Sequence, residues 1–136
     1  MKVVKEYPRF FYAKDGDEMF LPTKMEELKT VIWASTRSKI PGPDGWTMEI
    51  FMEYFDLMGS DLLRVVEDSR IRGVIPGDMT SNFVALNPKK SQTEDLGDFL
   101  PISLCNYVYK LIAKIIENRL KPILSRGLSV EKFVFL

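Results

Sequence analysis

Apolar residues recur at helical spacing in four parts of the chain, and glycine- and proline-containing breaks separate these parts. The first helix is predicted to start at Thr23, because Thr23 and Glu26 have the spacing of a capping box, in which each side chain satisfies a free backbone N–H. We expect this helix to end near the Ser38 to Gly45 segment, where prolines and glycines crowd together. Its buried face would consist of Leu28, Val31, Ile32 and Ser35.

Two further helices are predicted in the next part of the chain. The first would run from Thr47 to about Met58, and Gly59 would end it. The second would be capped by Ser60 and stopped by Gly73, followed by a turn at Pro76-Gly77. The apolar stripes of the two helices are Ile50, Phe51, Tyr54 and Phe55, and Leu62, Leu63, Val66 and Ile71.

The C-terminal part of the chain combines short apolar runs with one long helical pattern. The run from Ser81 to Leu86, bounded by Pro88, predicts a β-strand, and a polar loop follows it. After a second apolar run at Phe99 to Ile102, a helix is expected from about Asn106 to Leu124. Its apolar face is Val108, Leu111, Ile112 and Ile115, and its charged face is Lys110, Lys114, Glu117 and Lys121.

The first 20 residues show no clear period, and we treat them as a leader, within which Asp15-Gly16-Asp17 is interpreted as a turn. Residues 21–136 are expected to form one unit, because a chain of 136 residues buries roughly two-thirds of its unfolded surface. The pattern as a whole predicts an α+β fold that is mostly helical.

Composition narrows the classes of function. The 19 basic and 19 acidic residues balance, which argues against a stand-alone DNA-binding protein, although the part from Phe83 onward is mildly basic. Cys105 is the only cysteine and there is no histidine, so neither an internal disulfide nor a Cys/His zinc site is expected. No apolar run has the length of a signal-peptide core or a membrane span. We therefore expect an intracellular protein, of otherwise unknown location, that has no membrane partner.

Three segments have a more specific composition. In the first segment, residues 39–46, two prolines fix φ and two glycines permit positive φ, which predicts a rigid, sharply turned loop. An ordinary interhelical turn that carries a buried Trp46 would explain the same residues. The second ends the predicted strand, and the third leads into the last helix. The segments are Lys39-Ile40-Pro41-Gly42-Pro43-Asp44-Gly45-Trp46, then Asn82-Phe83-Val84-Ala85-Leu86-Asn87-Pro88-Lys89-Lys90, then Asp98-Phe99-Leu100-Pro101-Ile102-Ser103-Leu104-Cys105-Asn106 with Tyr109 to Lys114 and Asn118-Arg119-Leu120.

In order, spacing and residue identity, these segments resemble the reverse transcriptase domain of LINE-type (non-LTR) retrotransposons over roughly residues 20–136. The resemblance implies part of the fingers subdomain of a right-hand polymerase. It also implies that the intact protein performs RNA-directed DNA synthesis, with an RNA or DNA template and a nucleotide as partners and magnesium as cofactor. No cofactor is assigned to this chain itself.

The resemblance implies which residues contact the nucleotide or the template. Lys89, with Lys90 beside it, is the candidate phosphate contact, because a flexible ammonium group at a strand end can reach an incoming anion. Lys110 and Lys114, together with Lys121, would follow a nucleic-acid backbone. A solvated loop lysine and a solvated helix face explain the same residues. The family motif loop comprises Lys39, Pro41, Gly42, Pro43, Asp44 and Gly45.

The chain also departs from the family pattern. Leu100 stands where the family has an arginine before Pro-Ile-Ser, so one expected triphosphate ligand is absent. Asn87 replaces an aliphatic residue and Lys132 replaces a glutamine. No Asp-Asp pair occurs, and the family's metal-binding aspartates would follow this region, so we assign no catalytic residue and no metal ligand and expect no activity from this chain alone.

Two hypotheses remain open from the sequence. The first is an inactive fingers fragment of a reverse transcriptase, whose missing palm, or a second copy of the chain, would cover apolar residues left exposed. The second is a small RNA- or protein-interaction module derived from the same fold. Under the first hypothesis, the residues expected to be partly uncovered are Val108, Leu111, Ile112, Ile115, Phe133 and Phe135.

Overall fold

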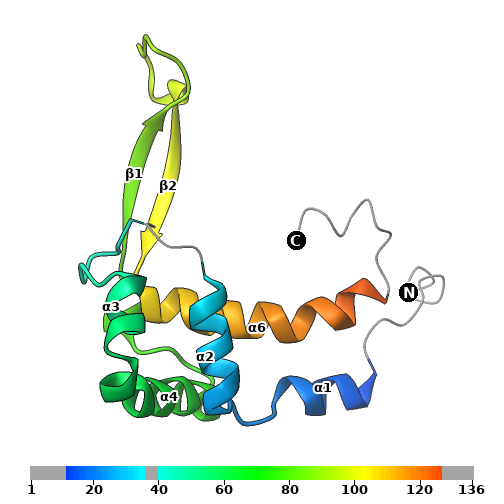
Figure 1. Ribbon diagram of the computed structural model, residues 1–136. Coiled ribbons are helices and arrows are strands. Elements are labelled where there is room, and N and C mark those ends of the chain that lie inside the picture. The colour runs from blue at the N-terminus through cyan, green and yellow to red at the C-terminus, as the bar shows by residue number, and fades with distance from the viewer. Residues whose placement is uncertain (1–11, 36–39, 127–136) are drawn as a thin grey trace, which may run out of the picture.

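The computed structural model describes residues 12–35 and 40–126, so the predictions for Lys39, Lys132, Phe133 and Phe135 lie outside the described residues. The helices form one body, from which a two-stranded antiparallel hairpin projects (Figure 1). This arrangement confirms the α+β, mostly helical prediction. The elements are α1 (Ala13–Met19), α2 (Met25–Ala34), α3 (Met48–Glu53), α4 (Phe55–Arg72), α5 (Gly77–Thr80), β1 (Asn82–Pro88), the 3-10 helix η2 (Leu96–Asp98), β2 (Phe99–Cys105) and α6 (Tyr107–Ser125).

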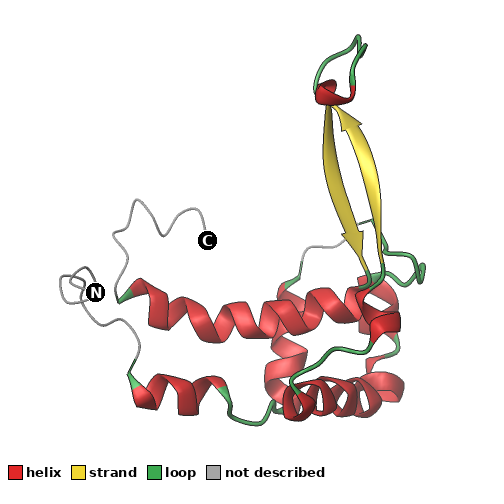
Figure 2. Ribbon diagram, turned by 180° about the vertical axis from the view of Figure 1, so that it is seen from behind, coloured by secondary structure: helices red, strands yellow, loops and turns green. Residues whose placement is uncertain are grey.

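The helices enclose a single apolar core around α2, which packs against α3, α4 and α6. The predicted face of α2 is confirmed, since Leu28, Val31 and Ile32 are buried and Ser35 is half-buried. In the view from behind, the hairpin stands clear of this helical body (Figure 2). The buried residues of the core cluster are Leu28, Val31, Ile32, Met48, Phe51, Phe55, Leu62, Val66, Tyr107, Leu111, Ile112 and Ile115.

The long helix α6 matches the predicted helix closely, but the expectation that its apolar face is left uncovered is wrong. Leu111, Ile112 and Ile115 are buried and Val108 is half-buried, because α1, α2 and α5 all pack against α6. Within the described part of the chain, no helix combines the length and the apolar character needed to cross a membrane.

The predicted capping box at Thr23 is wrong. α2 begins at Met25, and its N-cap residue Lys24 makes no side-chain cap. Thr23 is only 6% exposed, and its backbone N–H donates a 2.7 Å hydrogen bond to a Glu67 carboxylate oxygen on α4. In the predicted capping box the Thr23 N–H would donate to Glu26. In the structure it donates to Glu67 on another helix instead.

The boundary between the second and third predicted helices is also wrong. The helix does not end at Gly59; it breaks at Tyr54, and α4 then continues through Gly59 and Ser60 to Gly73. Gly59 is buried against Phe55, whose ring carbons would lie 3.1 to 3.3 Å from a β-carbon at this position. This glycine makes room for a core ring. Gly73 does end the helix, with a left-handed φ of 66°.

Asp15 lies in a helix, so the interpretation of Asp15-Gly16-Asp17 as a turn is wrong. Its carboxylate is buried and accepts a hydrogen bond from Arg126, just after the end of α6. This bond holds the pKa of Asp15 below its usual value. The ion pair and the contacts between the two helices attach α1 to α6.

Arg119 on α6 fixes the segment between α1 and α2. Its guanidinium donates to both carboxylate oxygens of Glu27, at 2.8 and 2.6 Å, and to the backbone carbonyls of Met19 and Leu21, at 3.1 and 2.6 Å. Planar, multidentate donation of this kind is specific to arginine. Arg119 was part of the third motif segment, and within this structure it joins three elements.

The hairpin confirms the predicted strand and extends it by two residues at its C-terminal end. β1 pairs with β2 from Asn82 opposite Cys105 to Pro88 opposite Phe99. Every residue of β1 is exposed, and none of the helices in the described part of the chain covers either face (Figure 1). Both faces carry exposed apolar side chains: Phe83, Leu100 and Ile102 on one, Val84 and Leu86 on the other. Two strands alone are marginally stable, so the hairpin depends on its attachment to the body.

The ion pair between Glu67 and Arg70 should make stability dependent on pH. Arg70, at 2.7 Å, and the Thr23 N–H together lower the pKa of Glu67 from 4.5 to about 2. Because the folded pKa is depressed, the contribution is complete above pH 4.5 and is lost as the pH falls toward 2. We expect Glu67→Gln to lower the free energy of unfolding by about 1–2 kcal/mol at pH 7, with the difference shrinking in that acid range. Urea denaturation followed by circular dichroism measures it.

Asp68→Asn is the matched control, because Asp68 pairs with Arg72 one residue along the same helix but both side chains are largely exposed. We expect this change to cost less than about 0.5 kcal/mol. Equal effects of the two substitutions, or a Glu67→Gln effect that persists unchanged at pH 2, would contradict the assignment.

Candidate functional site

The motif loop forms a tight turn in front of α3. The Gly45 N–H donates a 3.0 Å hydrogen bond to the Gly42 carbonyl, and Gly45 has a φ of 71°. The Asp44 carboxylate accepts a 3.1 Å hydrogen bond from the Trp46 N–H, which stabilises the exit from the turn. The predicted sharp turn of the loop is therefore confirmed over residues 40–46; Lys39 lies outside the described residues.

The two glycines of the loop serve different purposes. Gly45 supplies the positive φ. Gly42 supplies a close approach: a β-carbon there would lie 2.5 Å from the Asn106 backbone nitrogen and 2.5 Å from the Cys105 carbonyl carbon. Both distances are too short for any side chain, so only glycine allows the loop to touch the junction between β2 and α6.

Asn106 at this junction is the residue whose role sequence reasoning missed. Its side chain is 4% exposed; its carbonyl oxygen accepts from the Asp44 N–H at 3.2 Å and its amide donates to the Asp78 carbonyl at 3.1 Å. Asparagine before a long helical pattern suggests an N-cap. Here, however, the side chain does not cap α6. It holds the motif loop and α5 together.

The three motif segments consequently meet in one place. The second and third form the two strands of the hairpin, and the first packs against the point where the third enters α6. Residues 42 and 106 are far apart in sequence, so this convergence is a property of the folded chain.

Lys89 and Lys90 lie at the tip of the hairpin, and both are engaged there. The Lys89 ammonium donates to the Gly97 carbonyl at 3.0 Å, and Lys90 pairs with Asp98 at 2.8 Å. The Lys90 contact lowers the pKa of the Asp98 carboxyl. A phosphate bound at this tip would compete with these two local partners.

Lys110 and Lys114 lie on the first two turns of α6, beyond the base of the hairpin, and Lys89 lies past the far end of the seven-residue strand β1, which is about 23 Å long at 3.3 Å per residue. The Lys110 ammonium donates to the Ile40 carbonyl at 3.4 Å. Lys114 and Lys121 both pair with Glu117, at 2.9 and 2.6 Å, and lower its pKa. The structure thus divides the four predicted lysines into two pairs and partly neutralises each.

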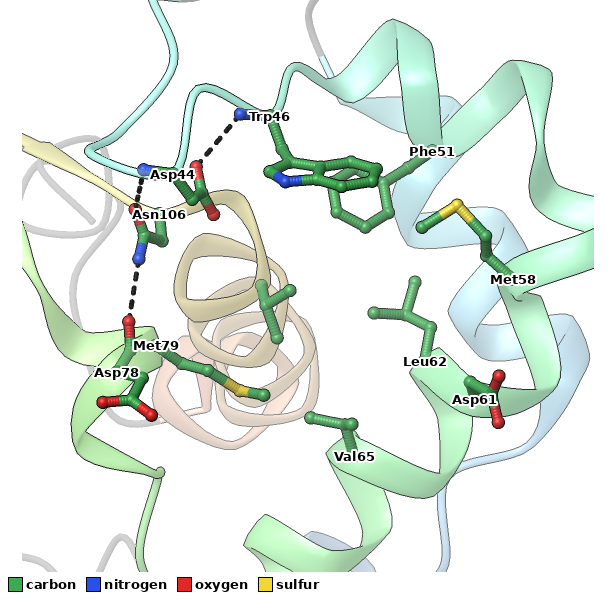
Figure 3. A pocket seen from close by; sticks show the side chains of 11 residues that line it. Asp44, Trp46, Phe51, Met58, Asp61, Leu62, Val65, Asp78, Met79 and Asn106 are labelled. Carbon is green, nitrogen blue, oxygen red and sulfur yellow. Dashed lines mark hydrogen bonds between the residues drawn. The ribbon is translucent and has the colours of Figure 1, made fainter.

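Trp46 separates two recesses beside the motif loop. It is 42% exposed, so the alternative of an ordinary turn with a buried tryptophan is wrong in that detail. One recess, of about 260 Å³, has two lysines, Lys110 and Lys114, and one acidic residue, Glu117, in its lining. The other, of about 350 Å³, has the aspartates Asp44, Asp61 and Asp78 among its lining (Figure 3). We call these the basic recess and the acidic recess.

Within residues 12–35 and 40–126, no group of three or more histidine, cysteine, aspartate or glutamate side chains has an arrangement that could hold a metal ion. Leu100, at the position expected to be arginine, lies opposite Asn87 near the hairpin tip and is 50% exposed. The tip therefore offers two lysines and an apolar surface.

These features define a small helical domain whose projecting hairpin is held by a glycine- and proline-rich loop. Comparison with known proteins relates it to a transposon: the chain is 33% identical, over 104 residues, to the Transposon TX1 uncharacterized 149 kDa protein of Xenopus laevis. The match covers 76% of this chain and 8% of that protein, so the chain spans a small part of its relative's length. No family model matches the chain.

The close approach of Gly42 to the junction predicts a position-specific effect of adding one methyl group. We expect Gly42→Ala to lower the free energy of unfolding by about 2–3 kcal/mol, because the backbone of Cys105 and Asn106 must move. Gly16→Ala is the control: nothing lies within 4 Å of a β-carbon there, and alanine favours the helix. Urea denaturation of both variants measures the difference. If Gly42→Ala were as stable as Gly16→Ala, the loop would not depend on this contact.

Proposed function

We propose that this chain is a fingers segment of an RNA-directed DNA polymerase from a LINE-type retroelement. Two observations support the proposal. The segments that resemble such enzymes converge on one structural junction, and the chain is similar to part of a transposon protein. The convergence of the three segments is the stronger support. Three stretches of sequence that each resemble the same family need not lie together in the fold, and here they do.

In this proposal the hairpin is the element that approaches the nucleotide and the template. Lys89 and Lys90 at its tip would exchange the Gly97 carbonyl and the Asp98 carboxylate for phosphate oxygens. The exposed apolar residues on both hairpin faces would pack against the remainder of the polymerase, or against a second copy of the chain.

The described residues do not offer a ligand set for the magnesium ions of such an enzyme. No catalytic step is therefore assigned to this chain, whose contribution would be to bind and orient. The metal-holding carboxylates would have to come from other parts of an intact polymerase.

The chain alone is expected not to extend a primer. Primer-extension assays with purified chain and either magnesium or manganese should show no incorporation, because the Asp-Asp pair of the family is absent from its sequence. A heat-inactivated sample is the background control. Reproducible, template-dependent extension would overturn this part of the proposal.

A chimera tests whether this chain can serve as the fingers segment of an active polymerase. Residues 40–126 would replace the corresponding fingers segment of an active LINE-type reverse transcriptase. We expect template-dependent extension with weak nucleotide use, and we expect Leu100→Arg to improve the apparent nucleotide affinity about tenfold by adding a charge-assisted hydrogen bond. Steady-state kinetics with varied nucleotide concentration measures both the rate of extension and the apparent nucleotide affinity.

Leu57→Arg is the matched control, since Leu57 is an exposed leucine on α4 in the helical body, away from the hairpin tip. This change should leave the nucleotide affinity of the chimera unaltered. A folded chimera that extends no primer with or without Leu100→Arg would contradict the proposed function. Binding of RNA by such an inactive chain would favour the interaction module.

A further inference from the structure

The acidic recess has an apolar floor and a negatively charged rim (Figure 3). Its floor is formed mainly by side chains of α3, α4 and α6, and its volume of about 350 Å³ accommodates one or two large side chains. Methionines contribute flexible, polarizable walls that adapt to different occupants. The apolar lining residues are Trp46, Phe51, Met58, Leu62, Val65, Met79 and Val108.

All of the charged residues that line the recess are acidic. Its lining includes Asp44, Asp61 and Asp78 and no basic residue. Asp61 pairs with Arg64, but both side chains are largely exposed, so water screens that pair. Among the described residues, no ion pair is formed by the carboxylates of Asp44 and Asp78.

This charge distinguishes the possible occupants. A nucleic-acid backbone would bring phosphates toward three carboxylates, which is unfavourable. A cationic group beside an apolar one matches both the rim and the floor. Trp46 at the edge of the recess is an exposed tryptophan, the residue type most often found at the energetic centre of protein interfaces.

We propose that the acidic recess binds a basic amphipathic segment of a partner polypeptide, with a large apolar side chain inserted between Trp46 and Met79 and neighbouring lysines or arginines on the carboxylates. The recess anchors the segment and does not form a whole interface, because its volume holds only one or two side chains. The inference concerns a protein partner and does not rest on the proposed polymerase function.

The test uses two labelled synthetic helical peptides with the same leucine face, one carrying lysine and the other glutamate at the remaining positions. Fluorescence anisotropy with the full chain should show saturable binding of the lysine peptide and at least about tenfold weaker binding of the glutamate peptide. Binding of the lysine peptide should weaken as salt is added.

The location is tested by charge reversal. Asp61→Lys combined with Asp78→Lys should weaken lysine-peptide binding about tenfold or more, and the corresponding asparagine double variant should show a smaller loss. Asp17→Lys combined with Glu94→Lys is the matched control, because it makes the same change in net charge at exposed sites on α1 and in the hairpin loop. All of the substituted side chains are exposed, and thermal melting confirms folding of each variant.

Equal losses in the recess variant and the control variant would show that only net charge matters and would overturn the proposal. So would equal binding of the two peptides. Saturable binding of labelled single-stranded RNA to the recess in the absence of peptide, or sedimentation data showing that a second copy of the chain occupies the recess, would replace the polypeptide partner with another occupant.

Discussion

The contact between Gly42 and the β2–α6 junction fixes how the motif loop and the hairpin are attached to the helical body. It places the motif loop directly on the backbone of Cys105 and Asn106, with no space for a side chain. The buried Asn106 side chain then bonds the loop on one side and α5 on the other. Because the hairpin has no core of its own, the orientation in which it leaves the helical body depends on this junction.

The helical body is held by a different kind of contact. Its apolar core around α2 supplies stabilisation that does not depend on direction. The hydrogen bonds and ion pairs of a few arginines fix how the helices are placed relative to one another. Arg119 attaches the α1–α2 link to α6, and Arg126 attaches α1 through Asp15. Charge is also unevenly distributed around Trp46: two lysines and Glu117 line one recess, and three aspartates line the other.

The elements that were predicted correctly have long or unambiguous periods. α6 and the buried face of α2 follow from helical spacing, and β1 follows from a short apolar run bounded by Pro88. The errors occurred where a residue has two plausible local uses. Gly59 can end a helix or admit a ring, and in the fold it admits the Phe55 ring. Thr23 can cap a helix, but a tertiary hydrogen bond takes its backbone N–H.

The candidate site shows the same division. The sequence by itself determined the α+β class, the sharp turn of the motif loop and the strand that ends at Pro88, because these depend on residue type and local spacing. Only the tertiary structure decided which of them act together. The bond from Asp44 to Asn106 joins residues 62 positions apart, and that from Arg119 to Glu27 joins residues 92 positions apart. Local preferences do not specify such pairs, since their geometry depends on how the whole core packs.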